Sequence, residues 1–203
     1  VDFDGDGKRD LWGSLPDIFA SAANYLSRSG WQGDKTWGRE VRIPAGFDIG
    51  LTRMSVRKPL VEWSKLGVRQ ANGKPLPQAD IDASLMVPAG YKGPAFLVYK
   101  NYRTILVWNR SHLYALAVGH LADRLVGNGP LKTPPPAADV PLSRADIRTL
   151  QTLLNDRRLD TGVPDGVMGP KTRAAVRAFQ NTAGLPPDGY ATNELIKILR
   201  ETP

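Results

Sequence analysis

The proline-rich stretch at residues 128–142 constrains the fold of this chain more than any other feature. It contains Asn128-Gly129-Pro130 and, a few residues later, three consecutive prolines at 134–136. Proline lacks a backbone N–H donor, so such a stretch favours an extended polyproline II conformation over helix or sheet. The sequence therefore predicts a semi-rigid linker at 128–142, preceded by one domain at 1–127 and followed by another at 143–203.

Composition excludes several classes of protein. The net charge of +7 is spread thinly along the 203 residues, without the basic block and interleaved aromatic residues that nucleic-acid binding would favour. No apolar run approaches the roughly 18 residues of a membrane span. Because the chain has no cysteine, disulfide bonds and thiolate metal sites are excluded as well.

The first residues carry carboxylates at alternating positions, Asp2, Asp4 and Asp6, closed by Gly7. In calcium loops of the EF-hand type, side-chain oxygens at this spacing converge on the cation, a glycine makes the sharp turn and the next residue adds a backbone carbonyl. Lys8 occupies that last place. The sequence thus predicts a structural Ca²⁺ site formed by Asp2, Asp4, Asp6 and Lys8.

The bidentate glutamate that ends a standard calcium loop is replaced here by Gly13. Asp17, just inside a helical pattern at 15–27, is the candidate for the remaining ligand. The alternative is a capping box with Ser14, in which the Asp17 carboxylate accepts a backbone N–H at the helix start. The pattern leaves both open.

The rest of the first domain is mixed. Alternating patterns predict strands at 37–43, 95–99 and 104–108, whereas an apolar stripe at 111–126 predicts a helix. Residues 44–94 are rich in proline and glycine and give no clear assignment. The expected fold class is α+β, mainly α.

The second domain has the pattern of a three-helix module. Ser143-x-x-Asp146 indicates the first helix start, Gly169-Pro170 indicates the second, and apolar residues at 195–199 indicate the third. Pro-Asp-Gly turns at 164–166 and 187–189 precede the second and third helices; in such turns aspartate caps its own backbone and glycine supplies positive φ.

Two stretches of sequence resemble known families. The block from Leu150-Gln151 to the turn at 187–189 closely resembles the three-helix peptidoglycan-binding domain appended to many cell-wall enzymes. Residues 1–127 resemble the later part of the catalytic domain of B-type lytic murein transglycosylases. The matching motifs are the calcium loop, Asp10-Leu11-Trp12, Ala23-Asn24-Tyr25, Asn101-Tyr102-Arg103 and Trp108-Asn109-Arg110-Ser111.

The resemblance implies a fold and an activity. The fold would be the later part of a lysozyme-like transglycosylase core with an EF-hand-like calcium loop, plus a small three-helix bundle. The activity would be non-hydrolytic cleavage of the MurNAc-β-1,4-GlcNAc bond with formation of 1,6-anhydroMurNAc. The family's catalytic glutamate precedes the calcium loop, so the resemblance assigns no catalytic residue to this chain. None of its four glutamates, Glu40, Glu62, Glu194 and Glu201, is expected to replace it.

The resemblance also implies binding residues and partners. Tyr25, Asn109 and Tyr114 would line the sugar cleft, although without it the tyrosines could be ordinary half-buried residues and Asn109 an N-cap. Beside the Pro-Asp-Gly turns, Thr172, Arg173 and Tyr190 are the candidates for contacts with peptidoglycan.

The implied partners are the glycan strands and stem peptides of peptidoglycan and the missing N-terminal part of the same protein. The implied location is the periplasm, with outer-membrane association through a lost N-terminal segment left open. The alternative function is a non-catalytic peptidoglycan-binding protein with a calcium-stabilised scaffold domain.

Overall fold

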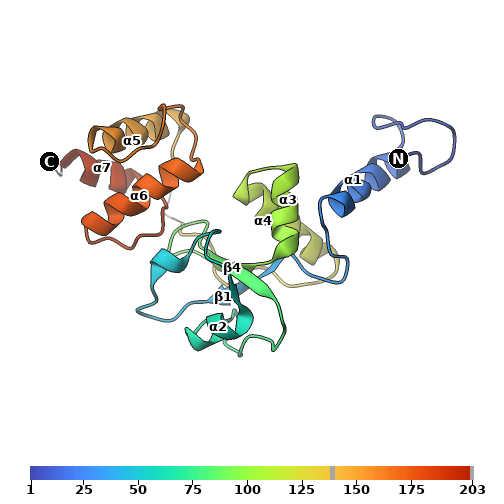
Figure 1. Ribbon diagram of the computed structural model, residues 1–203, viewed down its shortest axis with the longest axis horizontal. Helices are drawn as coiled ribbons and strands as arrows, with labels where there is room; N and C mark the ends of the chain where they lie inside the picture. Colours follow the sequence, from blue (N-terminus) through green and yellow to red (C-terminus); the bar gives the residue numbers. More distant parts are fainter. Residues whose placement is uncertain (138–139, 202–203) are drawn as a thin grey trace.

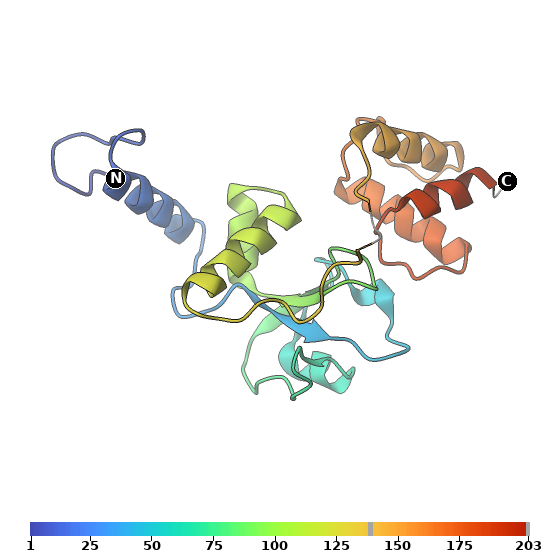
Figure 2. The ribbon, with the colours of Figure 1, turned by 180° about the vertical axis from the view of Figure 1, so that it is seen from behind.

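A computed structural model of the protein describes residues 1–137 and 140–201. Residues 138–139 of the predicted linker and 202–203 of the second predicted domain therefore lie outside the described residues. A mixed sheet-and-helix body occupies the centre, a helical body lies at one end, and the N-terminal loop with α1 (Leu15–Arg28) projects at the other (Figures 1 and 2).

The central body is built on an antiparallel sheet of five strands in the order β2-β4-β5-β1-β3. The strands are β1 (Gly38–Arg42), β2 (Lys58–Pro59), β3 (Arg69–Gln70), β4 (Asp82–Met86) and β5 (Ala95–Val98). Every residue of the central strand β5 is buried. Because successive side chains point to opposite faces of a strand, both faces of the sheet must be covered.

One face is covered by α2 (Leu60–Lys65), which appears below the sheet in Figure 1. Trp63 of this helix is fully buried in the same core cluster as Leu97 of β5, and its indole N–H donates to the Ala83 carbonyl at 3.1 Å. Residues 44–94, which the sequence left unassigned, supply this helix, the 3₁₀ helix η1 (Ile49–Leu51) and strands β2 to β4.

The opposite face lies beneath α3 (Lys100–Trp108) and α4 (His112–Leu125). Phe96 and Val98 of β5 pack there with Trp37 and Tyr102. Gly119 of α4 lies so close to Trp37 that a Cβ atom at this position would overlap the indole ring. The glycine therefore permits the close packing of α4 on the sheet.

The predicted strand at 104–108 is wrong, because these residues belong to α3. The run Thr104-Ile105-Leu106-Val107 has the β-branched composition of a strand, which misled the assignment. In the structure Asn101, Thr104 and Ile105 are buried along one side of the helix, which is helical and not alternating spacing. Packing on the sheet thus overrides the local preference. Strands at β1 and β5 and the helix at α4 agree with the predictions.

The helical body contains α5 (Arg144–Asp156), α6 (Pro170–Thr182) and α7 (Asn193–Glu201). A capping box of Ser143 and Asp146 starts α5, and Pro170 is the first residue of α6, as the sequence predicted. Their apolar faces form one core, whose fully buried members are Leu150, Leu154, Val176 and Leu199.

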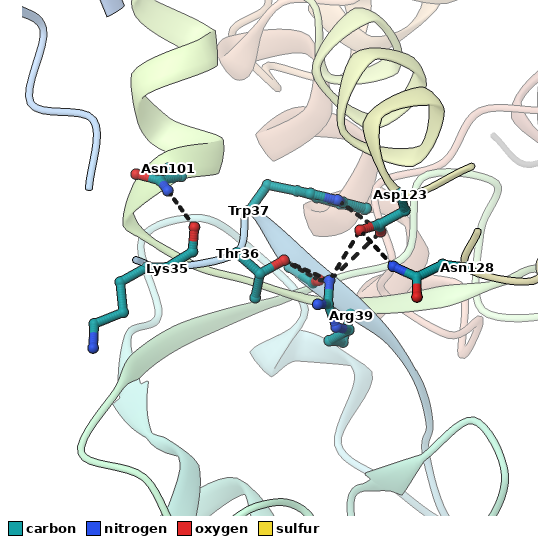
Figure 3. A network of polar contacts seen from close by, with 8 residues as sticks. Lys35, Thr36, Trp37, Arg39, Asn101, Asp123 and Asn128 are labelled. Carbon is teal, nitrogen blue, oxygen red and sulfur yellow. Dashed lines mark hydrogen bonds and ion pairs between the residues drawn. The ribbon is translucent and has the colours of Figure 1, made fainter. Parts of the chain in front are cut away.

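The linker lies along the central body over its first residues. Both oxygens of the Glu40 carboxylate accept backbone N–H groups, from Lys132 and Thr133, at 2.7 Å each. Just before it, Asp123 at the end of α4 accepts the Trp37 indole N–H at 3.0 Å (Figure 3). The same carboxylate pairs with Arg39 at 3.4 Å and accepts from the Asn128 amide at 3.2 Å. This part of the linker is therefore held on the sheet by specific hydrogen bonds.

Candidate functional site

The predicted calcium loop brings its three carboxylates together. Asp2, Asp4 and Asp6 each offer an oxygen, and these oxygens lie within 4.8 Å of one another on an exposed loop. Gly5 and Gly7 adopt positive φ values of 78° and 85°, which lets the loop turn sharply. The Lys8 N–H donates to Asp6 at 2.8 Å, so Lys8 also lies in the loop. Three converging hard oxygen donors suit a Ca²⁺ ion.

Asp17 fastens this loop to α1. Its buried carboxylate accepts the backbone N–H groups of Phe3 at 2.7 Å and Asp10 at 2.9 Å. The hydrogen bond from Phe3 is the main cause that lowers the pKa of Asp17 below its usual value. Ser14 caps the helix by accepting the Asp17 N–H, but the Asp17 carboxylate reaches the loop and not the Ser14 N–H. Asp17 is not one of the three clustered carboxylates.

Tyr25, one of the predicted cleft residues, meets Trp108 where α1 approaches α3. Tyr25 packs edge to face on Trp108, with ring centroids 5.1 Å apart and an interplanar angle of 87°. Both rings remain partly exposed, unlike the buried Trp37 and Trp63. The sequence named Trp108 in a matching motif without singling it out as a site residue; only its exposure next to Tyr25 distinguishes it from the buried tryptophans.

Asn109 and Tyr114 flank the turn between α3 and α4. Asn109 is the C-cap of α3, and its side-chain oxygen accepts the Ser111 N–H at 2.9 Å. Ser111, not Asn109, caps α4, since its hydroxyl accepts the Tyr114 N–H. Tyr114 in the first turn of α4 is partly exposed. The structure therefore holds the Asn109 side chain in the turn between α3 and α4 and places Tyr114 in the first turn of α4.

His112, which starts α4 and is half-buried, pairs with the buried Tyr102. The Tyr102 hydroxyl lies 3.0 Å from His112 Nδ1, and the rings stack at a centroid distance of 6.0 Å. Burial is the main cause that lowers the pKa of His112, followed by the positive charge of Arg173 from the second domain. The two domains are thus close enough here to interact electrostatically.

The two Pro-Asp-Gly turns of the second domain are held by the same hydrogen bonds. Asp165 accepts from the Gln151 side chain at 2.9 Å, and the Gln151 oxygen accepts the Gly166 N–H at 2.8 Å. Asp188 and Gln180 repeat this arrangement at 2.8 Å and, with the Gly189 N–H, at 2.9 Å. The buried glutamines hold both turns rigidly.

Among the hydrogen bonds of residues 1–137 and 140–201, those of the second turn reach the first domain and those of the first turn do not. The other Asp188 oxygen, Oδ2, accepts the Tyr91 N–H at 2.9 Å. The Arg177 guanidinium donates to the Thr52 carbonyl at 3.4 Å. These bonds join the turn and α6 to loops of the sheet.

Thr172, Arg173 and Tyr190 occupy different environments. Thr172 is buried and accepts from the Gln151 amide at 3.1 Å, so its side chain supports the first turn. Arg173 and Tyr190 lie at the domain junction: Arg173 acts electrostatically on Tyr102, and Tyr190 packs against Gly90. Burial lowers the pKa of the Arg173 guanidinium, and no ion pair of Arg173 is found in residues 1–137 and 140–201.

The chain matches the profile of the transglycosylase SLT domain over residues 1–123 and that of the peptidoglycan binding domain over 143–199. It therefore belongs to the transglycosylase SLT domain family and carries a C-terminal peptidoglycan-binding domain. No curated protein matches the sequence. None of the helices within the described residues is long and apolar enough to cross a membrane.

Solved structures of lytic transglycosylases are similar to this chain. SltB3 from Pseudomonas aeruginosa, in complex with NAG-anhNAM-pentapeptide, is 53% identical with a TM-score of 0.93 over 98% of this chain and 54% of SltB3. The chain thus spans about half the length of that enzyme. Escherichia coli Slt35 in complex with bulgecin A is 26% identical with a TM-score of 0.51, over 62% of this chain and 38% of Slt35.

Proposed function

We propose that this chain is a segment of a lytic transglycosylase that cleaves MurNAc-β-1,4-GlcNAc bonds of peptidoglycan and forms 1,6-anhydroMurNAc. Its C-terminal domain would anchor the enzyme to the cell wall. The likeness to SltB3 carries this proposal, because it extends over 98% of the chain and includes both domains and the linker. The crystal structure of SltB3 in complex with NAG-anhNAM-pentapeptide supports the same substrate class. The place of action would be the periplasm.

The general acid of such a reaction would come from outside residues 1–203. Glycosidic cleavage needs a carboxylic acid that can protonate the leaving oxygen. The Glu40 carboxylate is occupied by the linker, Glu62 pairs with Lys58 at 3.1 Å, and Glu194 lies 3.9 Å from Lys197 on an exposed helix. Glu201 is exposed at the end of α7. Among the described residues, none of these four carboxylates has a hydrogen bond or ion pair with Tyr25, Trp108 or Asn109.

The contribution of the first domain would be one wall of the sugar cleft. The exposed rings of Tyr25 and Trp108 offer apolar faces on which a pyranose can stack. The Asn109 amide can donate to an acetamido carbonyl or to a sugar hydroxyl. Tyr114 would extend this wall along α4.

Arg173 would bind a carboxylate of a stem peptide. A partly buried cation is costly unless an anion compensates it, and a guanidinium can bind a carboxylate through two parallel hydrogen bonds. Tyr190 would lie beside the bound peptide, while Thr172 would act indirectly by holding the first turn.

The N-terminal loop would bind one structural Ca²⁺ ion through Asp2, Asp4, Asp6 and the Lys8 carbonyl. The three crowded carboxylates repel one another, so a bound cation would stabilise the loop. Asp17 would position the loop on α1 or, on slight rearrangement, supply a further ligand.

Other parts of the same protein would cover the apolar surface of the N-terminal loop and α1. Trp12 is 98% exposed, and Phe3, Leu11, Leu15 and Phe19 are also exposed along the loop and α1. Apolar surface of this extent marks an interaction site. The missing N-terminal part of the transglycosylase is the partner we propose.

The proposal is tested by comparing this chain with a longer protein that includes the remainder of the transglycosylase. We expect the longer protein to release anhydromuropeptides from purified sacculi, whereas residues 1–203 should bind sacculi without cleaving them. Loss of a general acid costs about 10²–10⁴ in rate. Anhydromuropeptide release by residues 1–203 alone would refute the assignment of the acid. A longer protein that binds but never cleaves would favour the non-catalytic alternative.

A further inference from the structure

A cavity of about 370 Å³ lies at the junction of the two domains. One wall is the loop of residues 89–92 between β4 and β5; the other comes from the second Pro-Asp-Gly turn and α7. Its apolar lining includes Ala89, Tyr91, Leu185, Pro186, Tyr190 and Ile198. Ligand-binding cavities have this range of volume and this mainly apolar lining.

Docking of the domains creates the cavity. The hydrogen bond from the Tyr91 N–H to Asp188 fixes the loop against the turn at 2.9 Å. Gly90, with φ of +74°, packs so closely that a Cβ atom would lie 3.0 Å from the Tyr190 ring. Neither domain alone has both walls, so a ligand bound here would contact both.

The two buried polar side chains of the lining, Gln180 and Asp188, are already paired. The Gln180 amide donates to Asp188 at 2.8 Å and to the Tyr190 carbonyl at 3.2 Å, and Asp188 accepts from Tyr91 as well. These groups shape the cavity and leave few sites for a ligand. A charged group of a ligand would therefore be bound by the exposed side chains of the lining.

Lys92 is the cation of the lining. It is exposed, its ammonium lies 5.7 Å from the centre of the Tyr91 ring, and it has no ion-pair partner among residues 1–137 and 140–201. The acidic residues of the lining are Glu194 on α7 and Asp188, whose carboxylate already accepts hydrogen bonds from Gln180 and Tyr91. A ligand that suits this arrangement has aliphatic groups for the walls and a carboxylate for Lys92.

We propose that this junction cavity binds the stem peptide of peptidoglycan, with a peptide carboxylate paired to Lys92 and aliphatic side chains against Tyr91, Pro186 and Ile198. The inference rests on the proposed function, since peptidoglycan is the polymer whose peptides combine small aliphatic side chains with free carboxylates. On this proposal the first domain also binds the cell wall, through Lys92, which lies outside the proposed sugar cleft.

The test is a titration of residues 1–203 with a soluble muramyl pentapeptide, followed by calorimetry or NMR. We expect Lys92→Ala to weaken binding about fivefold, the upper range for an exposed ion pair. Lys65→Ala is the matched control, because Lys65 is an exposed lysine at the end of α2 and does not line the cavity. A pentapeptide with amidated carboxyl groups should bind the wild-type chain and Lys92→Ala equally.

Equal affinities of the wild-type chain and Lys92→Ala for the carboxylate peptide would overturn the proposal. If Lys92→Ala discriminates between the carboxylate and amidated peptides as strongly as the wild-type chain does, the proposal is also overturned, since Lys92 would then add nothing to the carboxylate binding proposed for Arg173. Sedimentation with sacculi separates this failure from failure of the proposed function. If all variants still sediment with sacculi, the domain binds the wall through another surface.

Discussion

The replacement Asp188→Asn should loosen the two domains while leaving each of them folded. One oxygen of Asp188 accepts from Gln180 and from the Tyr190 N–H, both at 2.8 Å; among the described residues, the other accepts only from Tyr91. Asparagine can keep the first oxygen and preserve the turn. Its NH₂ group would then face the Tyr91 N–H, so that two donors oppose each other and the bond between the domains is lost.

The size of the effect follows from the kind of bond. A hydrogen bond to a charged group contributes about 1.5–3 kcal/mol, and Asp188 is only 7% exposed, so water replaces the bond poorly. A loss of ~2 kcal/mol would lower the ratio of docked to undocked molecules about 30-fold. Asp188→Asn also removes a negative charge near the Arg177 guanidinium, and this loss too favours the undocked state.

Asp165→Asn is the matched control. Asp165 accepts from Gln151 and from the Val167 N–H in the same geometry, but it has no contact with the first domain among the described residues. Solution scattering and limited proteolysis of the linker would report docking, and circular dichroism would report folding. We expect expansion and faster linker cleavage for Asp188→Asn alone. If the two variants behave alike, the Asp188 bond does not hold the domains together.

Three further predictions concern the first domain. Gly119→Ala should destabilise it by about 1–3 kcal/mol in urea unfolding, because the methyl group would overlap Trp37; a stabilised variant, as helix propensity alone predicts, would contradict this packing. Chelation of calcium should lower the melting temperature of the wild-type chain, since the proposed ion would bind the folded loop and not the unfolded chain. It should not affect a variant with Asp2, Asp4 and Asp6 replaced by asparagine; equal shifts would exclude the site. Burial lowers the pKa of His112, so its neutral form stabilises the fold above the unfolded value of about 6.5, and this contribution declines as the pH falls below it. His112→Gln should therefore show a weaker loss of stability between about pH 7 and 5.5, and an unchanged pH profile would contradict this role.

The sequence by itself determined the features that depend on neighbouring residues. The capping box of Ser143 and Asp146, Pro170 at the start of α6 and the two Pro-Asp-Gly turns all act within a few residues, so the helices of the second domain could be located. The cluster of Asp2, Asp4 and Asp6 was equally predictable, because a short loop sets the spacing of its carboxylates. Long motifs carried the family resemblance, which the profile matches confirm.

Tertiary structure decided the features that depend on distant partners. The two-residue strands β2 and β3 exist only through pairing with β4 and β1, so no local pattern could reveal them. Residues 104–108 prefer strand locally, yet burial of one side against the sheet makes them helical. The exposure of Trp108 beside Tyr25 likewise depends on where α1 lies.

The two aspartate turns illustrate the limit most clearly. Asp165 and Asp188 have the same local sequence and the same hydrogen bonds to a buried glutamine. Only Asp188 binds the first domain, because the Tyr91 N–H, 97 residues away in the chain, lies against it. Local sequence fixes the shape of such a turn through short-range hydrogen bonds, whereas its partner is set by the packing of whole domains.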